Sequence, residues 1–183
     1  MTAIEHEPGD IIAFWREAGP ERWFRQDDDF DRELAGRFRA LHQAAANGSL
    51  DDWAGDADGS LALILVLDQF SRNMFRKSAA AFAQDAKALS VADAALRRAF
   101  DRPFDTDMRC FFYLPFEHSE SLSDQHRCVA LVHQLGDRNY LDYAILHREI
   151  IHRFGRFPHR NSVLGRHTSP AEKTFLESGG FSG

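Results

Sequence analysis

The chain has 183 residues, of which 44% are hydrophobic and 27% charged, and its formal net charge at pH 7 is −6. This length favours a single domain, residues 1–183, with a core of its own. The negative charge argues against nucleic acid or a membrane surface as the main partner. The first residues lack the basic start and apolar run of a secretory signal peptide. We therefore expect a cytoplasmic protein in which Cys110 and Cys128 are buried thiols.

The charge is unevenly distributed along the chain. Residues 1–60 hold fourteen acidic and six basic residues, whereas residues 147–166 hold five arginines and one glutamate. A segment that gathers arginine and histidine side chains in an acidic protein either binds an anion or pairs with acidic elements of the same chain.

Hydrophobic periodicity divides the first half of the chain into helices. The segment that begins at Ser60 is apolar nearly all round, which is typical of a buried central helix. The sixteen phenylalanines of the chain indicate a core packed with aromatic rings. The predicted helices of this half span Ile11–Ala18, Asp27 to about Ala46, Ser60 to about Phe75, and Ala79–Phe100.

The second half of the chain carries clearer signals for where its helices begin and end. Ser121 with Asp124 resembles a capping box, and Ser169 with Glu172 is one, with a proline at the first helical position. Gly155 suits the left-handed residue that ends a helix. The predicted helices span Asp105 or Thr106 to about Glu120 with Pro115 inside, Ser121–Leu135, a helix capped by Asn139 that runs to Phe154, and a short segment from Pro170.

No stretch has the alternation of a β-strand, so the sequence predicts an all-α fold of seven to eight helices. Short turns between consecutive helices favour stacked antiparallel hairpins in a compact body. Residues 155–168 are predicted to form an irregular loop, rich in arginine and histidine, that packs on the bundle.

Four segments carry a resemblance to a known family. They are LDQFSRNMFR (67–76), FFYLPFEHSE (111–120), HREIIHRFGRFPHRNSVLGR (147–166) and TSPAEKTFL (168–176). In this order they resemble a bacterial family of uncharacterised proteins, domain of unknown function 924. The resemblance implies a tetratricopeptide-like, right-handed α–α arrangement over nearly the whole chain, and it implies no established activity.

Polar side chains gather at the ends of three predicted helices, and in stacked hairpins such ends meet at one rim. We therefore expect one mixed-charge pocket, in which His118 and His147 act as proton carriers near neutral pH. Arginine forks would bind a carboxylate or phosphate group of a small ligand. The expected ligand-binding residues are Asp68, Gln69, Arg72, Asn73, Arg76, Glu117, Glu120, Arg153, Arg156, His159, Arg160, Asn161 and Arg166.

A structural interpretation competes with this site. The acids Asp68, Glu117 and Glu120 would then pair with Arg72, Arg156 and Arg160, fixing the C-terminal loop to the bundle, as ion-pair networks often do. A third interpretation is a peptide- or protein-interaction module of the tetratricopeptide-like type, by analogy of fold.

No metal or cofactor is expected. His147 and His152 are five residues apart, which places them off a common helical face, unlike a helical zinc pair. The sequence contains no glycine-rich nucleotide motif and no nucleophile elbow. RNA binding through the basic loop is disfavoured by the overall charge.

Overall fold

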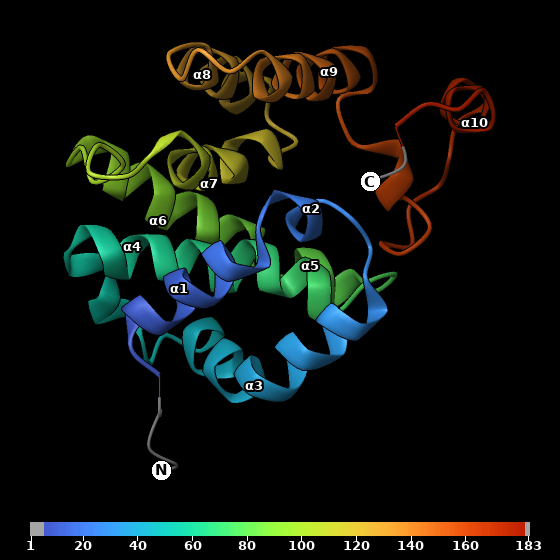
Figure 1. The fold of residues 1–183 in the computed structure, drawn as a ribbon. Coiled ribbons are helices and arrows are strands. Elements are labelled where there is room, and N and C mark those ends of the chain that lie inside the picture. Colours follow the sequence, from blue (N-terminus) through green and yellow to red (C-terminus); the bar gives the residue numbers. More distant parts are fainter. Residues whose placement is uncertain (1–5, 182–183) are drawn as a thin grey trace. The chain divides into compact units, whose positions relative to one another are not determined.

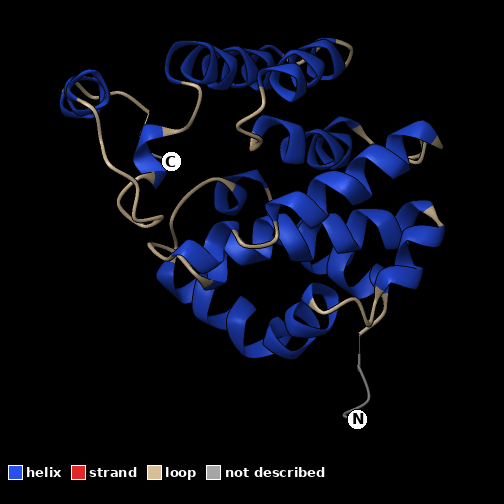
Figure 2. Ribbon diagram, turned by 180° about the vertical axis from the view of Figure 1, so that it is seen from behind, coloured by secondary structure: helices blue, strands red, loops and turns tan. Residues whose placement is uncertain are grey.

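The computed structural model describes residues 6–181, and every regular element in that range is a helix (Figure 2). The predicted all-α class is confirmed. The chain divides into two compact units, Met1–Arg76 with Ala80–Pro115, and Lys77–Ala79 with Phe116–Gly183. The single domain and the tetratricopeptide-like arrangement stay predictions.

Counting the unbroken helix Ala57–Met74 once, residues 6–181 form nine helices. The one beyond the predicted number is α2, a four-residue turn in a segment expected to be a connection. The elements of the first unit are α1 (Pro8–Ala18), α2 (Pro20–Trp23), α3 (Asp28–Ala46), η1 (Asp51–Gly55), α4 (Ala57–Ile64), η2 (Leu65–Phe70), α5 (Ser71–Met74), α6 (Asp85–Arg97) and most of α7 (Thr106–Glu117).

Aromatic rings fill the core of the first unit, as predicted. The Trp15 ring lies 5.6 Å from that of Phe70 and 5.7 Å from that of Phe111, and Phe38 packs on Phe70 at 5.2 Å. Trp23 closes one side, because its Nε1 donates a hydrogen bond to the carbonyl oxygen of Trp15 (2.6 Å). Such ring pairs favour edge-on and offset contacts.

The central helix is buried, as predicted, and its middle section is a π-helix. The segments α4, η2 and α5 follow one another without a break (Figure 1), and every residue of η2 is buried. Ser71 Oγ donates to the carbonyl oxygen of Leu67 (2.6 Å) and lies 2.8 Å from Nε2 of His42. The Ser71 hydroxyl thus supplies a hydrogen bond to the Leu67 carbonyl oxygen, which lies where the α-helical hydrogen-bond pattern is interrupted. Turns of π-helix often occur at functional sites.

The predicted helix Ala79–Phe100 is interrupted. A 3₁₀ turn, η3 (Ala79–Phe82), is followed by α6, which begins at Asp85. Asp85 accepts two hydrogen bonds from Arg72 at the positive end of the α6 dipole, which favours a helix start there. At the other end Ala99 adopts a left-handed conformation (φ 57°), and the helix ends before it.

The second unit holds the end of α7 and the elements α8 (Leu122–His133), α9 (Arg138–Phe154), η4 (Pro158–Arg160) and α10 (Pro170–Glu177). Helices α8 and α9 lie side by side as a hairpin (Figure 1). The hydrophobic core of this unit contains the buried side chains of Ile150, Ile151 and Phe157. The partly buried rings of Phe154, Phe175 and Phe181 pack against it.

Two predicted caps are correct and two are wrong. Gly155 is left-handed (φ 69°), and Ser169 with Glu172 forms the capping box of α10. The Ser121 side chain makes no cap hydrogen bond. Its Oγ lies 2.8 Å from Ser123 Oγ, and Asp124 accepts from Ser119 Oγ (2.7 Å).

Helix α9 is capped by Asp137 rather than by Asn139. The Asp137 carboxylate accepts hydrogen bonds from the backbone N–H groups of Asn139 and Tyr140. A carboxylate two residues further back therefore takes the role that we gave to the asparagine.

Both cysteines, Cys110 and Cys128, are buried and neither forms a disulfide, as expected. Across residues 6–181, none of the helices combines the length and apolar character that crossing a membrane requires.

Candidate functional site

The first predicted cluster lies in the first unit, at the polar end of the central helix. Arg72 bonds to both oxygens of Asp85 (2.9 and 3.1 Å) and lies 3.1 Å from Asp68. Burial opposes the charge of Arg72, but the carboxylates of Asp68 and Asp85 raise its pKa above the ordinary value. Gln69 donates to Asp68 at 2.6 Å. The predicted pair Asp68–Arg72 is therefore present, and the bonds from Arg72 to Asp85 tie α6 to the central helix.

Asn73 and Arg76 belong to the same cluster and turn toward α3. Asn73 Nδ2 donates to Asp31 Oδ1 (2.7 Å), and Arg76 binds both oxygens of the same carboxylate. Every basic member of this cluster thus has a carboxylate partner from a neighbouring helix of its own unit. This is the arrangement of a structural network rather than of an empty anion clamp.

The other two predicted clusters both lie in the second unit, where they meet. Glu120 follows α7 and is bound by Arg166 through two hydrogen bonds (2.7 and 3.0 Å). Its Oε1 also accepts from the backbone N–H of Phe157 (2.8 Å), while Arg166 donates to the Phe157 carbonyl (3.0 Å). Burial raises the pKa of Glu120, but Arg166 and the Phe157 N–H outweigh it and hold that pKa below its ordinary value. This ion pair fixes both backbone polar groups of Phe157.

A second ion pair fixes the far end of the loop, with a partner that differs from the prediction. Arg156 binds Glu172 of α10 through two hydrogen bonds (2.6 and 2.9 Å) and donates to the His167 carbonyl (2.7 Å). These bonds hold the pKa of the buried Glu172 well below its usual range. The sequence identified Glu172 only as a capping residue, and its second role depends on the path of the loop.

Once these ion pairs are accounted for, a cluster of imidazole and aromatic rings remains beside them. We call it the imidazole cluster: His147 from α9, His159 from η4, and the rings of Phe157 and Phe181. The His147 ring lies 5.5 Å from Phe157 and 4.5 Å from Phe181, and the His159 ring lies 5.6 and 5.3 Å from the same two rings. The arginine of η4 borders it, since the Arg160 guanidinium carbon lies 4.4 Å from the Phe157 ring centre.

His147 is held in one tautomer beside a carboxylate. Its Nδ1 lies 2.9 Å from the carbonyl oxygen of Tyr143 and 3.5 Å from Oε1 of Glu117. A carbonyl oxygen only accepts hydrogen bonds, so Nδ1 carries a proton and donates it to Tyr143. Both His147 and Glu117 are buried. A carboxylate beside an imidazole orients the ring, which is an arrangement seen at acid–base sites.

His159 is an unusual member of the cluster because it is partly buried, with its Nδ1 atom fully buried, and because it is kept neutral. Burial, and after it the neighbouring Arg160 and His147, lower its pKa from 6.5 to about 3, with a smaller contribution from His118. Glu120 acts in the opposite direction. Within residues 6–181, no group forms a hydrogen bond to the buried Nδ1 of His159. The site therefore combines a positive local potential with an imidazole nitrogen that is available for bonding.

The remaining predicted residues lie at the margins of this cluster. Asn161 accepts from Arg166 Nε (3.0 Å), and His118 is partly buried in the turn after α7. Arg153 is exposed, with its guanidinium over the rings of Phe154 and Phe175. Phe181 was not predicted, because no periodic pattern points to an isolated aromatic residue after a Gly-Gly pair.

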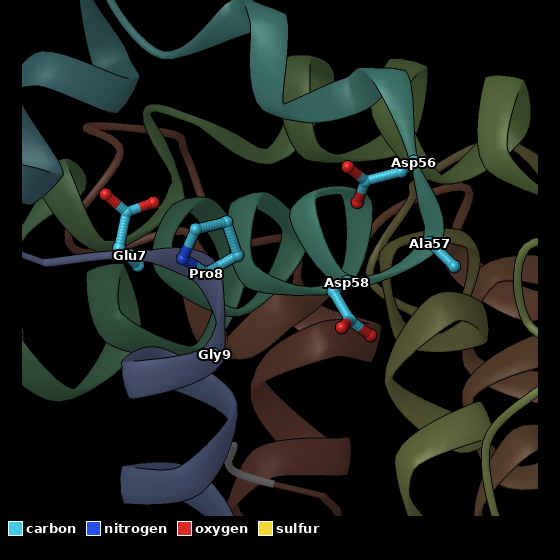
Figure 3. Close-up of a pocket in the computed structure, with 6 residues that line it drawn as sticks. All are labelled: Glu7, Pro8, Gly9, Asp56, Ala57 and Asp58. Carbon is cyan, nitrogen blue, oxygen red and sulfur yellow. The ribbon is translucent and has the colours of Figure 1, made fainter.

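Two further observations bear on what the chain can bind. The residues that the structure describes contain no group of three or more His, Cys, Asp or Glu side chains suited to a metal ion. In the first unit, the start of α1 and the start of α4 line a hollow of about 500 Å³ with Glu7, Asp56 and Asp58 (Figure 3). Asp56 caps its own helix by accepting from the Gly59 N–H (2.8 Å), so it serves the local backbone.

Comparison with known proteins places the chain in a family. A family model described as "Bacterial protein of unknown function (DUF924)" matches residues 11–180. The chain belongs to this DUF924 family. A solved structure of a protein of unknown function from Agrobacterium tumefaciens is 48% identical, with a TM-score of 0.91 over 93% of this chain and 97% of that one. A search of curated proteins gives no significant match. The DUF924 assignment agrees with the resemblance drawn from the sequence.

Proposed function

We propose that this DUF924 protein binds a small anion of the carboxylate or phosphate type at the imidazole cluster, with His159 as its first contact. The observation that carries the proposal is the buried Nδ1 of His159, to which no group in residues 6–181 forms a hydrogen bond. Buried polar atoms are normally satisfied, and exceptions often mark a site for a missing partner.

Electrostatics favours an anion as that partner. Arg160 acts against protonation of His159 more strongly than Glu120 favours it, so the potential around His159 is positive. A bound anion reverses this balance, because an opposite charge within about 4–6 Å raises the pKa of an imidazole by roughly 1–3 units. The bound state then takes up a proton more readily than the free state, and binding strengthens as the pH falls from 7.5 toward 5.5.

The arginines named in the sequence have different roles in this proposal. Arg156 and Arg166 already hold Glu172 and Glu120, so they shape the loop and do not serve as the external clamp. Arg160 borders the imidazole cluster and supplies positive charge. His147, oriented by Glu117, is the group best suited to exchange a proton with a bound ligand, so the proposal extends to acid–base catalysis in the cytoplasm.

The alternative, a peptide- or protein-interaction module, has less support. Tyr143 and Leu146 on α9 are exposed by 57% and 39%. Scattered exposed apolar side chains are normal on protein surfaces and do not specify a partner. The anion site is therefore the function that the geometry supports better.

Isothermal titration calorimetry with inorganic phosphate and with acetate, at pH 7.5 and 5.5, tests the proposal. We expect binding that strengthens at pH 5.5 and weakens by roughly 10- to 100-fold in His159→Phe, because a hydrogen bond to a charged group contributes about 1.5–3 kcal/mol. Lys173→Met is the matched control, since it removes a positive charge from the exposed face of α10. Equal affinities in the wild type and His159→Phe, or no binding of either anion, would contradict the proposal.

A further inference from the structure

The ring of Phe181 packs against both histidines of the imidazole cluster, and it is held differently from the ring of Phe157. Phe157 is fully buried, and Glu120 and Arg166 fix its backbone. Phe181 is only partly buried, and it meets His147 and His159 edge-on at interplanar angles of 65° and 73°. The position of Phe157 is therefore fixed by an ion pair, whereas the Phe181 ring can move away from the histidines without breaking an ion pair.

The chain reaches this position through two glycines. After α10 ends, Gly179 adopts a left-handed conformation (φ 81°), and the Gly180 N–H donates to the Phe175 carbonyl (3.0 Å). A Cβ at Gly180 would lie 2.5 Å from that carbonyl oxygen and 2.7 Å from two ring atoms of Phe175, so only glycine fits there. Figure 1 shows the end of the described chain returning from α10 to η4. The Gly-Gly pair thus directs Phe181 onto the imidazoles.

A ligand that binds Nδ1 of His159 would have to displace the Phe181 ring, because this ring packs against the His159 imidazole. A small inorganic anion would gain a hydrogen bond but lose the two edge-on ring contacts. A ligand with a planar ring of its own regains them, because aromatic pairs at these distances attract beyond the area that they bury.

We propose that Phe181 occupies a subsite for the planar ring of an aromatic anion, an aryl carboxylate or aryl phosphate, whose acidic group binds His159. This inference rests on the proposed anion site and adds the class of ligand. The Phe181 ring and the ligand ring would then compete for the same position against His147 and His159.

Calorimetric titration with benzoate, cyclohexanecarboxylate and acetate tests this competition. In Phe181→Ala we expect benzoate to bind about tenfold more tightly than in the wild type, equivalent to about 1.4 kcal/mol. Benzoate should bind more tightly than its saturated analogue, since only the planar ring replaces the aromatic contacts. Phenyl phosphate, set against inorganic phosphate, should show the same preference if the acidic group is a phosphate.

Two variants separate displacement of the ring from loss of stability. Gly180→Ala keeps the Phe181 ring, but the added Cβ would clash with Phe175 and force the backbone before Phe181 to move. The Phe181 ring should then lose its position against the histidines, and benzoate should bind more tightly, as in Phe181→Ala. Phe175→Leu is the matched control, because Phe175 packs on the same apolar cluster and its ring pairs with Phe154 rather than with an imidazole. It should leave benzoate binding unchanged. Far-UV circular dichroism and thermal unfolding verify that each variant is folded.

The outcomes distinguish this inference from the proposed function. If acetate and phosphate bind in a His159-dependent way, but benzoate binds equally to the wild type and to Phe181→Ala, the ring subsite is wrong and the anion site stands. Weaker benzoate binding in Phe181→Ala also overturns the inference, because Phe181 would then cover the ligand instead of competing with it. If no anion binds any variant, both proposals fail.

Discussion

Replacing His159 by phenylalanine should flatten the dependence of the folding free energy on pH. The ordinary pKa of histidine, 6.5, applies to the unfolded chain, whereas the folded protein holds it at about 3. Between these values the unfolded state binds a proton that the folded state does not. Stability from the neutral imidazole is therefore fully present above about pH 6.5 and is lost as the pH falls toward 3.

The magnitude follows from the pKa difference. Each pH unit inside this window costs about 1.4 kcal/mol of unfolding free energy. Between pH 7.5 and 5.0 the wild type should thus lose about 2 kcal/mol through His159 alone. Contributions from other groups, including the carboxylates of Glu120 and Glu172, are shared by wild type and variant, so they cancel in the difference between the two slopes.

Urea unfolding followed by far-UV circular dichroism at pH 7.5 and 5.0 measures this difference. We expect His159→Phe to lose about 2 kcal/mol less than the wild type over this interval. His126→Phe is the control, because it removes an exposed imidazole from α8 and should keep the wild-type slope. If the wild type and His159→Phe lose the same free energy, His159 is not held neutral by the fold, and the electrostatic support for the anion site disappears.

The remaining predictions concern backbone conformation and one ion pair. Gly155→Ala should destabilise the protein by about 1–2 kcal/mol, because Gly155 is left-handed, whereas Gly36→Ala should stabilise it by up to about 1 kcal/mol, since it lies exposed inside α3 with open space for a Cβ. Ala99→Gly should stabilise by about 0.5–1 kcal/mol, because it relieves a left-handed alanine. Glu172→Gln should cost about 1.5–3 kcal/mol at pH 7 by breaking the pair with Arg156. That cost should shrink as the pH falls below 4.5, the ordinary pKa of glutamate. The ionised Glu172 carboxylate stabilises the folded state, and this stability is lost as the pH approaches the lowered pKa of the folded protein. Urea unfolding tests all four, and opposite signs for the two glycine variants are the decisive comparison.

Helix formation in this chain was largely predictable from local signals. The buried central helix was read from its uninterrupted apolar residues, and the ends of α9 and α10 from Gly155 and the Ser169–Glu172 box. Such signals act within one or two turns, so the sequence contains them fully. The errors arose where local signals compete, as at Ser121, whose expected partner Asp124 bonds to Ser119 instead.

The candidate site could be predicted only in part. The sequence marked residues 147–166 as a concentration of arginine and histidine, and it placed His147 and Glu117 at helix ends. It gave no means of assigning partners, because Arg156 with Glu172 and Arg166 with Glu120 are 16 and 46 residues apart. Which arginine meets which carboxylate depends on the path of an irregular loop, and no periodicity describes such a path.

By itself, then, the sequence determined the all-helical class, the DUF924 resemblance and the segment in which basic groups collect. The tertiary structure decided which of those groups are already neutralised and which are not. It showed that two arginines fix the loop, that His159 lies partly buried in a positive potential, and that the Phe181 ring packs against the imidazoles. The physical reason is that burial and charge neighbours are set by contacts between distant parts of the chain, whereas helix formation is set by neighbours along it.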